Sequence, residues 1–352
     1  MEIRLASAPG EVRIALLKDD ALLDAALWRP GAPDGWGDTH IVRITAHAPH
    51  LGGAFVELAG PAETGFMKGR KLPPEGSFVC AQITRSAQNG KGLRLRVLPA
   101  SNDIEIGEAP RLITPGPTPL DDILQRAPAD CPLIVDDAAL AARLPASLHP
   151  RLKRVSRSFD DVLEADWAAL SSPDASVGPL IAHITPTHAL TAIDLDAHQT
   201  PDFAANLACF GPLLREIRLR NLSGTILIDP AGVRSNKRPA LVPFLRKAAD
   251  KEQDPLQPRI TGITPSGLLE MTRPRHRAPL HELYSSPHGQ GLAILQRIIT
   301  EGLKGEHLHA PPAIIRALET DKIALDAFFH TTGRRLTLHS HPVSPSSCWS
   351  LS

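Results

Sequence analysis

Three aspartates near the ends of two apolar runs could hold a metal ion. Residues 191–196 (TAIDLD) place Asp194 and Asp196 on one face of an expected strand, because side chains alternate along a strand. Residues 224–229 (GTILID) end a second expected strand on Asp229, at the sheet edge where catalytic groups gather. Such carboxylates suit Mg²⁺ or Mn²⁺, which can activate a water and neutralise the negative charge on a phosphodiester. The pattern alone also fits acids that only cap helices or end strands.

An α/β arrangement is expected around these acids. Residues 201–219 form the longest helix candidate, with Asp202 as its cap and a basic last turn that complements the helix dipole. Apolar runs bounded by turn residues predict the strands, and helical spacing of apolar residues predicts the other helices. We expect strands at 133–135, 178–185, 188–195 and 258–264, and helices at 137–144, 159–170, 238–251 and 289–303.

The first hundred residues are expected to be mostly β structure. Residues 2–6 and 11–17 alternate as strands, whereas residues 22–28 fit either a strand or a short helix. Residues 85–92 (RSAQNGKG) form a basic hairpin tip, since Asn89-Gly90 is a strong turn signal. Five short strands between residues 38 and 99 predict a small closed β-barrel of the OB type. These strands are 41–46, 53–58, 64–67, 77–83 and 93–97.

Length and composition limit the class of protein. A chain of 352 residues, 42% apolar and 22% charged, predicts two or three globular domains. The formal net charge of zero argues against a uniformly basic surface, but it leaves local basic grooves open. Each basic cluster also fits a solvated face. The clusters are Lys68, Arg70 and Lys71; Lys91, Arg94 and Arg96; and Arg215, Arg218 and Arg220.

The cysteines and the N-terminus indicate a cytoplasmic protein. Cys80, Cys131, Cys209 and Cys348 are far apart and form no CxxC pair, which is typical of reduced cysteines rather than of a zinc site. The N-terminal segment lacks the apolar core of a signal peptide, and no apolar run reaches the length of a membrane span. We therefore expect a soluble, cytoplasmic protein without a membrane partner.

Several motifs in order resemble the catalytic region of the ribonuclease E/G family. Residues 190–196 (LTAIDLD) and 226–229 (ILID) are similar to the family's two strands that carry metal-binding aspartates. Asn206-Leu207 lies in the helix between them, followed by residues 215–224 (REIRLRNLSG), which look like the family's basic helix end and turn. Residues 262–271 (GITPSGLLEM) look like its downstream signature.

The resemblance implies a multidomain α/β fold. An RNase-H-like domain, formed by residues 1–37 and 131–180, would carry an inserted OB-fold β-barrel at 38–100. A linker at 101–130 would follow the barrel. An α/β nuclease domain would occupy residues 181–283, and a small C-terminal α/β domain residues 284–352.

The resemblance also implies a metal-dependent endoribonuclease that cleaves single-stranded RNA in RNA processing or decay. Asp194 and Asp229 would bind one Mg²⁺, with Mn²⁺ as a substitute. Asp196 would orient the attacking water, or contact the metal ligands without binding the ion. Attack on the phosphodiester would leave a 5′-phosphate on the downstream product. RNA would be held by Phe55, Phe66, Lys91, Arg218 and Arg220, although both rings also fit a barrel core.

The sequence departs from the family at several positions. The short 101–132 stretch has no counterpart of the family's 5′-end sensor, and residues 280–287 (LHELYSSP) lack its zinc-binding cysteines, so no zinc is expected. A homodimer through the C-terminal domain stays open. A catalytically weak or inactive RNA-binding relative, acting in RNA or ribosome maturation, is the alternative, and a structural α/β protein with coincidental acids is a third. His183, His188 and His198 lie near the acids, where chance proximity is the simpler interpretation.

Overall fold

The computed structural model describes residues 1–59, 64–69, 71–99, 106–197, 202–340 and 349–352 of the chain. Internal contacts divide the chain into two compact units. The first comprises Met1–Pro33, Thr118–Asp166 and Leu280–Ser352, and the second comprises Asp34–Pro117 and Trp167–Pro279. Each unit is therefore assembled from segments that are far apart in the sequence. In the described residues, no helix combines the length and the apolar composition needed to cross a bilayer.

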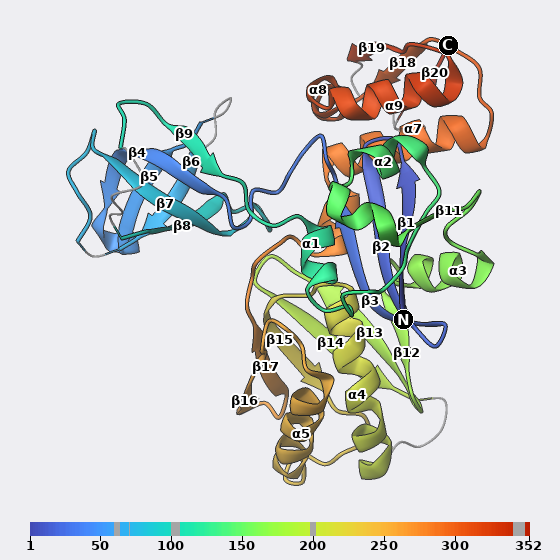
Figure 1. Ribbon diagram of the computed structural model, residues 1–352. Helices are drawn as coiled ribbons and strands as arrows, with labels where there is room; N and C mark the ends of the chain where they lie inside the picture. The colour runs from blue at the N-terminus through green and yellow to red at the C-terminus, as the bar shows by residue number, and fades with distance from the viewer. Residues whose placement is uncertain (60–63, 70, 100–105, 198–201, 341–348) are drawn as a thin grey trace. The chain divides into compact units, whose positions relative to one another are not determined.

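A five-stranded sheet forms the centre of the first unit, in the order β11-β10-β1-β2-β3 (Figure 1). β1 to β3 form an antiparallel meander, and β10 and β11 continue the sheet in parallel beside β1. Alternate residues such as Ile3, Ile14 and Leu133 are fully buried and cluster with Leu120 and Leu140 of two short helices. Of the two structures expected for residues 22–28, the strand is found. The elements are β1 Glu2–Ala8, β2 Glu11–Lys18, β3 Ala21–Trp28, α1 Pro119–Leu124, β10 Leu133–Val135, α2 Ala138–Arg143, η2 Ala146–Arg151 and β11 Leu152–Arg154.

The C-terminal segment of the first unit has its own hydrophobic cluster, which includes Leu295 and Leu308. Helices α7 to α9 pack with the three-stranded sheet β19-β18-β20 in this cluster. Gly10, in the β1–β2 turn, approaches it closely, since a Cβ there would lie 2.6 Å from Cβ of Ala324 and 2.7 Å from Leu292. The segment predicted as a small C-terminal domain thus packs against the β1–β2 turn. The elements are α6 Leu280–Ser285, α7 Pro287–Thr300, β18 His307–Ala310, α8 Pro312–Thr320, α9 Lys322–Thr332, β19 Thr337–Ser340 and β20 Ser350–Leu351.

The second unit begins with a closed barrel of five strands, which pair in the order β4-β5-β6-β8-β7 and back to β4. Val42, Ile44, Val56, Met67 and Leu95 fill its interior, because alternate side chains point inward. All five predicted strands are present. The elements are β4 Thr39–Ala48, η1 Pro49–Leu51, β5 Gly53–Glu57, β6 Thr64–Lys68, β7 Phe78–Arg85 and β8 Leu93–Val97.

A six-stranded sheet forms the rest of the second unit, in the order β12-β13-β14-β15-β17-β16. Helices α4 and α5 bury one of its faces, where Ile193, Ile226 and Ile228 join Leu213 and Leu245 in one core. The opposite face carries the alternate, more exposed side chains. The elements are β12 Asp174–Val177, β13 Leu180–Pro186, β14 Leu190–Asp196, α4 Phe203–Leu219, β15 Gly224–Asp229, η3 Arg238–Leu241, α5 Val242–Glu252, β16 Arg259–Ile263 and β17 Leu269–Arg273.

Two predicted segment assignments need correction. The segment 101–130 is more than a linker, because β9 (Arg111–Thr114) pairs with β4 at the side of the barrel and α1 packs in the core of the first unit. The expected RNase-H-like domain includes residues 174–177, yet β12 is the edge strand of the six-stranded sheet. Helix α3 (Asp161–Ala169) contains the boundary between the two units, which falls at Asp166 rather than at residue 180.

Candidate functional site

The structure brings Asp194 and Asp229 together. β14 and β15 run parallel, and Asp194 is the direct neighbour of Asp229 in their register. Because adjacent strands lie about 4.8 Å apart, both carboxylates can reach one point above the sheet. Ile193 and Ile228, next to them in the chain, point into the core below α4 and α5, so the aspartates project from the open face. Both acids therefore lie at the strand positions that the sequence pattern predicts.

The row of polar side chains continues across two more strands. His183 on β13 lies opposite Asp194, and Asp174 on β12 lies opposite His183. Nδ1 of His183 and Oδ1 of Asp174 are 2.7 Å apart and form a hydrogen bond. This bond raises the pKa of His183 above its usual value, and the negative charges of Asp174, Asp194 and Asp196 add to the effect. His183, considered a chance neighbour at the sequence level, is thus part of the same row.

Asp196 lies on the same face as Asp194, two residues further along β14. Its side chain is exposed, and Oδ1 accepts a hydrogen bond from the N–H of Ala197 at 2.7 Å. Its partner across the sheet is Ile181 rather than one of the acids. Asp196 is therefore near the pair but is not its third member in register.

Arg238, in η3, is a neighbour that the sequence argument missed. Its Nη1 lies 2.8 Å from Oδ1 of Asp229, while its other contacts include the carbonyl oxygens of Val233 and Gly267. The contact with Asp229 is an ion pair without hydrogen-bond geometry, and this buried Oδ1 has no hydrogen-bond partner. No motif in the sequence indicates the pairing, because it depends on how the loop after β15 folds back.

The two aspartates suit Mg²⁺ better than a metal ion whose ligands all come from the protein. Mg²⁺ is commonly held by one or two carboxylates, with waters and substrate phosphates as its other ligands. Among the described residues, no three histidine, cysteine or acidic side chains converge as a metal cluster. Asp194 and Asp229 supply the two carboxylates, and Oδ1 of Asp229 already faces a positive charge, the guanidinium of Arg238.

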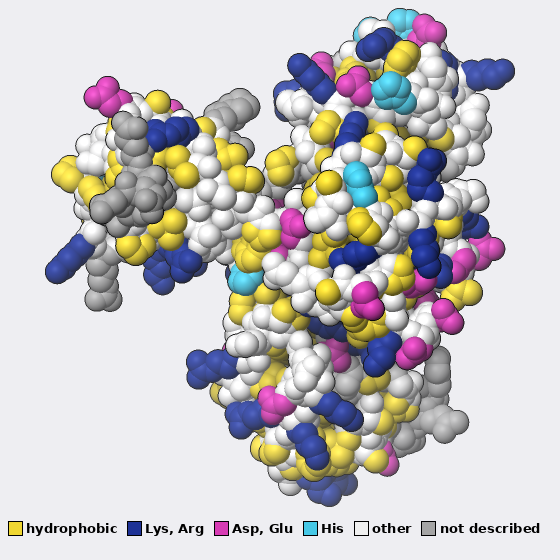
Figure 2. All heavy atoms as spheres, viewed as in Figure 1, with side chains coloured by type: hydrophobic (Ala, Val, Ile, Leu, Met, Phe, Trp, Pro, Cys, Tyr) yellow, Lys and Arg dark blue, Asp and Glu magenta, His cyan; other side chains and the backbone are white. Residues whose placement is uncertain are grey.

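Two aromatic rings lie on the outside of the barrel. Phe55 of β5 and Phe66 of β6 are paired neighbours, with ring centroids 5.5 Å apart in an edge-to-face arrangement. Phe55 is 44% exposed, and Phe66 is half-buried between the inward-facing Gly65 and Met67. The alternative in which both rings fill the barrel core is therefore wrong. Hydrophobic and basic side chains both reach the surface of this barrel (Figure 2).

The β7–β8 hairpin tip forms as predicted. Asn89 and Gly90 both have positive φ, at 53° and 66°, and Gln88 and Lys91 exchange two backbone hydrogen bonds around them. Lys91 is exposed at the tip. His188 bonds to Asn89 there, so it is a hairpin contact rather than part of the acidic row. His198 lies outside the described residues.

The prediction that Arg218 and Arg220 hold RNA needs correction. Their side chains are only 7% and 6% exposed. Arg218 donates twice to Glu252, at 3.0 and 2.8 Å, and Arg220 pairs with Glu216 and bonds to the carbonyl oxygen of Ala169. Both arginines hold the end of α4 in place, so neither presents its charge to a ligand.

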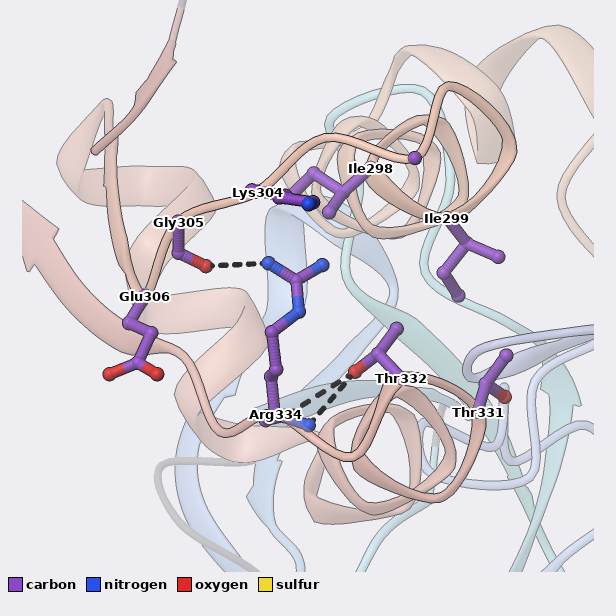
Figure 3. A pocket seen from close by; sticks show the side chains of 9 residues that line it. Ile298, Ile299, Lys304, Gly305, Glu306, Thr331, Thr332 and Arg334 are labelled. Atoms are coloured by element: carbon purple, nitrogen blue, oxygen red, sulfur yellow. Dashed lines mark hydrogen bonds between the residues drawn. The ribbon is translucent and has the colours of Figure 1, made fainter.

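A hollow of about 620 Å³ lies in the C-terminal segment of the first unit (Figure 3). Ile298, Ile299 and Lys304 help to line it, together with Arg334. The guanidinium of Arg334 donates to the carbonyl oxygens of Gly305 and Leu303, at 2.9 and 2.8 Å. Arg334 therefore fastens the turn between α7 and β18.

Comparison with known proteins relates the acidic site to one family. Residues 176–276 match the sequence model of the Ribonuclease E/G family. Ribonuclease G of Salmonella typhimurium is 28% identical over 165 residues, which cover 40% of this chain and 33% of that protein. Ribonuclease E of Synechocystis sp. is 29% identical over 140 residues, which cover 37% of this chain and 20% of that protein. The chain thus spans a third or less of the length of these relatives.

The matched segment contains all of β13 to β17 and therefore both aspartates of the pair. Ribonuclease G of Escherichia coli (strain K12) is 27% identical over 165 residues, which cover 40% of this chain and 33% of that protein. The resemblance drawn from the ordered motifs is confirmed, since residues 176–276 are similar to the Ribonuclease E/G family.

Proposed function

We propose that the protein is a Mg²⁺-dependent endoribonuclease that cleaves single-stranded RNA. The observation that carries the proposal is the register pairing of Asp194 with Asp229 on the open face of the sheet, within the segment that matches the family. Two carboxylates side by side on the open face favour a hard divalent cation. Mn²⁺ would substitute for Mg²⁺ at such an oxygen site.

In this proposal the chain's own residues hold the cation and the RNA. Asp194 and Asp229 bind the metal, which when bound neutralises phosphodiester charge and supplies a hydroxide at neutral pH. Asp196, exposed on the same face, orients the attacking water. His183, fixed by Asp174 through Nδ1, lies beside Asp194, and its Nε2 is available to hydrogen-bond to the substrate. Hydrolysis leaves a 5′-phosphate on the downstream product.

The barrel supplies the RNA-binding surface in this proposal. We propose that the barrel is of the OB type, which its strand order supports. In OB folds the second and third strands and the loop between the fourth and fifth commonly bind oligonucleotides. Phe55 and Phe66 lie on the second and third strands, and Lys91 lies in that loop. Exposed rings can stack on bases of any sequence, while lysine contacts a phosphate. We likewise propose an RNase-H-like fold for the β11-β10-β1-β2-β3 sheet.

The test is cleavage of a labelled A/U-rich oligonucleotide in the presence of Mg²⁺. Because a metal stabilises the transition state by several kcal/mol, we expect Asp194→Asn and Asp229→Asn each to slow cleavage about 100-fold or more. Asp326→Asn, at an exposed position of α9, is the matched control and should retain the wild-type rate. Mn²⁺ binding, followed by electron paramagnetic resonance, should weaken in the two site variants alone. Unchanged cleavage in both site variants would refute the proposal.

One observation favours the alternative of an RNA-binding relative without turnover. The guanidinium of Arg238 already lies against Asp229, where a cation would have to share or displace it. An Arg238→Gln variant separates the two functions. If the wild-type protein binds the oligonucleotide without cleaving it in Mg²⁺ or Mn²⁺, and Arg238→Gln binds Mn²⁺ more tightly, the non-catalytic function is favoured.

A further inference from the structure

Two arginines lie opposite each other on the neighbouring barrel strands β7 and β8. Arg85 ends β7, and its partner in the antiparallel register is the exposed Arg94 of β8. A β-bulge at Thr84 produces this pairing, because a regular ladder would place Thr84 opposite Arg94. Bulges re-aim side chains, and like charges directly opposite each other destabilise a sheet. The pair therefore calls for a compensating negative charge.

A third arginine lies beside this pair within the second unit. The N–H of Ser86 donates to the carbonyl oxygen of His276 at 2.8 Å, so the segment after Arg85 runs next to the segment that contains Arg275. The guanidinium of Arg275 lies over the backbone of Gly224, where a Cβ would be 2.8 Å from its Nε. Gly224 has a φ of 87°, a conformation that favours glycine, and the absence of a side chain there leaves room for this guanidinium.

The positive charges of these arginines are not balanced by protein groups. In the described part of the chain, no carboxylate forms an ion pair with Arg85, Arg94 or Arg275. Nη2 of Arg85 donates to the carbonyl oxygen of Gly92 at 2.8 Å, but its Nε is buried without a hydrogen-bond partner. Burial lowers the pKa of Arg85, and the charges of Arg94 and Arg275 lower it further.

We propose that Arg85, Arg94 and Arg275 form a binding site for a phosphodiester group of single-stranded RNA. A phosphate oxygen would satisfy the buried Nε and neutralise the facing arginines, and guanidinium groups match phosphate geometry. The identity of the ligand as RNA rests on the proposed function.

The position of the arginines on the barrel supports RNA over a free anion. Phe55, Phe66, Arg94 and Arg85 occupy one continuous row across β5, β6, β8 and β7. At about 4.8 Å per strand, this row spans roughly 14 Å, a length on the scale of two nucleotides. Bases stacked on the two rings would thus be followed by a phosphate at the arginines. Arg275 then continues the path toward the segment next to β15.

The salt dependence of binding tests the proposal. Affinity for an oligonucleotide is measured without divalent ions between about 50 and 200 mM salt, using Arg94→Gln and Arg275→Gln. Each lost phosphate contact should lower the slope of log affinity against log salt by about 0.7, since that is the value for single strands. Arg43→Gln is the control, because Arg43, like Arg94, is an exposed arginine of the barrel, but it faces Glu57 instead. Slopes equal to that of the control would overturn the proposal.

Two further arms identify the source of the phosphate. The variants should lose the same affinity for an oligonucleotide with a 5′-hydroxyl as for one with a 5′-phosphate. A loss seen only with the 5′-phosphate would mean that the site does not bind an internal phosphodiester. Inorganic phosphate should raise the melting temperature of the wild type more than chloride at equal ionic strength, and this rise should disappear in both variants. If phosphate raises the melting temperature but the variants bind the oligonucleotide as tightly as the wild type, the assignment to RNA is wrong. Arginine-dependent binding without cleavage would contradict the proposed function and leave this site standing.

Discussion

The buried amide of Asn206 holds the loop that follows Asp229. Its Nδ2 donates to the carbonyl oxygens of Asp202 and Ala231, both at 2.8 Å, and its Oδ1 accepts from the N–H of Ala231 at 3.1 Å. Asn206→Ala removes all three bonds and leaves both backbone groups of Ala231, itself 6% exposed, without these partners. An unsatisfied buried group costs about 1–3 kcal/mol, so we expect the free energy of unfolding to fall by about 2–6 kcal/mol.

Urea unfolding measures this loss, and Mn²⁺ binding measures its effect on the site. Because Ala231 is two residues beyond Asp229, we expect Asn206→Ala to weaken Mn²⁺ binding under conditions where the variant is still folded. Asp202→Ala is the matched control: it removes the cap of the same helix, the 2.8 Å bond to the N–H of Ala205, at about 1 kcal/mol. If Asn206→Ala lowers the free energy of unfolding no more than Asp202→Ala and leaves Mn²⁺ binding unchanged, this account of how the loop is held is wrong.

Three shorter predictions follow from other contacts. Asp254→Asn breaks a buried two-bond pair with Arg273, whose side chains are 4% and 3% exposed, and should cost about 3–5 kcal/mol in urea unfolding; a loss below about 1 kcal/mol would contradict this. Gly53→Ala places a Cβ 2.6 Å from an aromatic ring of the neighbouring strand, so it should cost about 1–3 kcal/mol and weaken oligonucleotide binding. Asp174→Asn should lower the pKa of His183 toward 6.5 in an NMR titration. Because that pKa is raised in the folded protein, the pair stabilises it below pH 6.5, and this contribution is lost as the pH rises through the folded value.

The positions of the two aspartates could be predicted from the sequence for a local reason. Apolar residues alternate with Asp194 and precede Asp229, so strand geometry alone sets which face each acid occupies. Their direct pairing needed a second fact, that β14 and β15 are parallel neighbours, and the helix between them made this the natural connection. The partner Arg238 could not be predicted, because only the fold of the intervening loop brings it to Asp229.

The arginines show where local patterns are insufficient. Arg218 and Arg220 form a basic helix end, a pattern typical of a solvated or ligand-binding surface. The structure pairs Arg218 with Glu252, which is 34 residues away in the sequence, and Arg220 with a backbone carbonyl of the chain before β12. These partners belong to other elements, so the sequence could not distinguish a structural arginine from one that binds RNA. Conversely, Arg275 belongs to the basic segment 273–277 (RPRHR), which was not singled out from the sequence, and it lies beside Arg85 because β7 and the chain after β17 run together.

Both candidate sites depend on the register of a hairpin. In the β13–β14 hairpin, the turn bond from the N–H of Thr187 to the carbonyl oxygen of Leu190 fixes the pairing that sets His183 opposite Asp194. In the β7–β8 hairpin, the Asn89-Gly90 turn and the bulge together set Arg85 opposite Arg94. A slip of one residue would move every side chain of the shifted strand to the other face. An insertion that shifts the β13–β14 register should therefore separate His183 from Asp194, and one that shifts the β7–β8 register should separate Arg85 from Arg94.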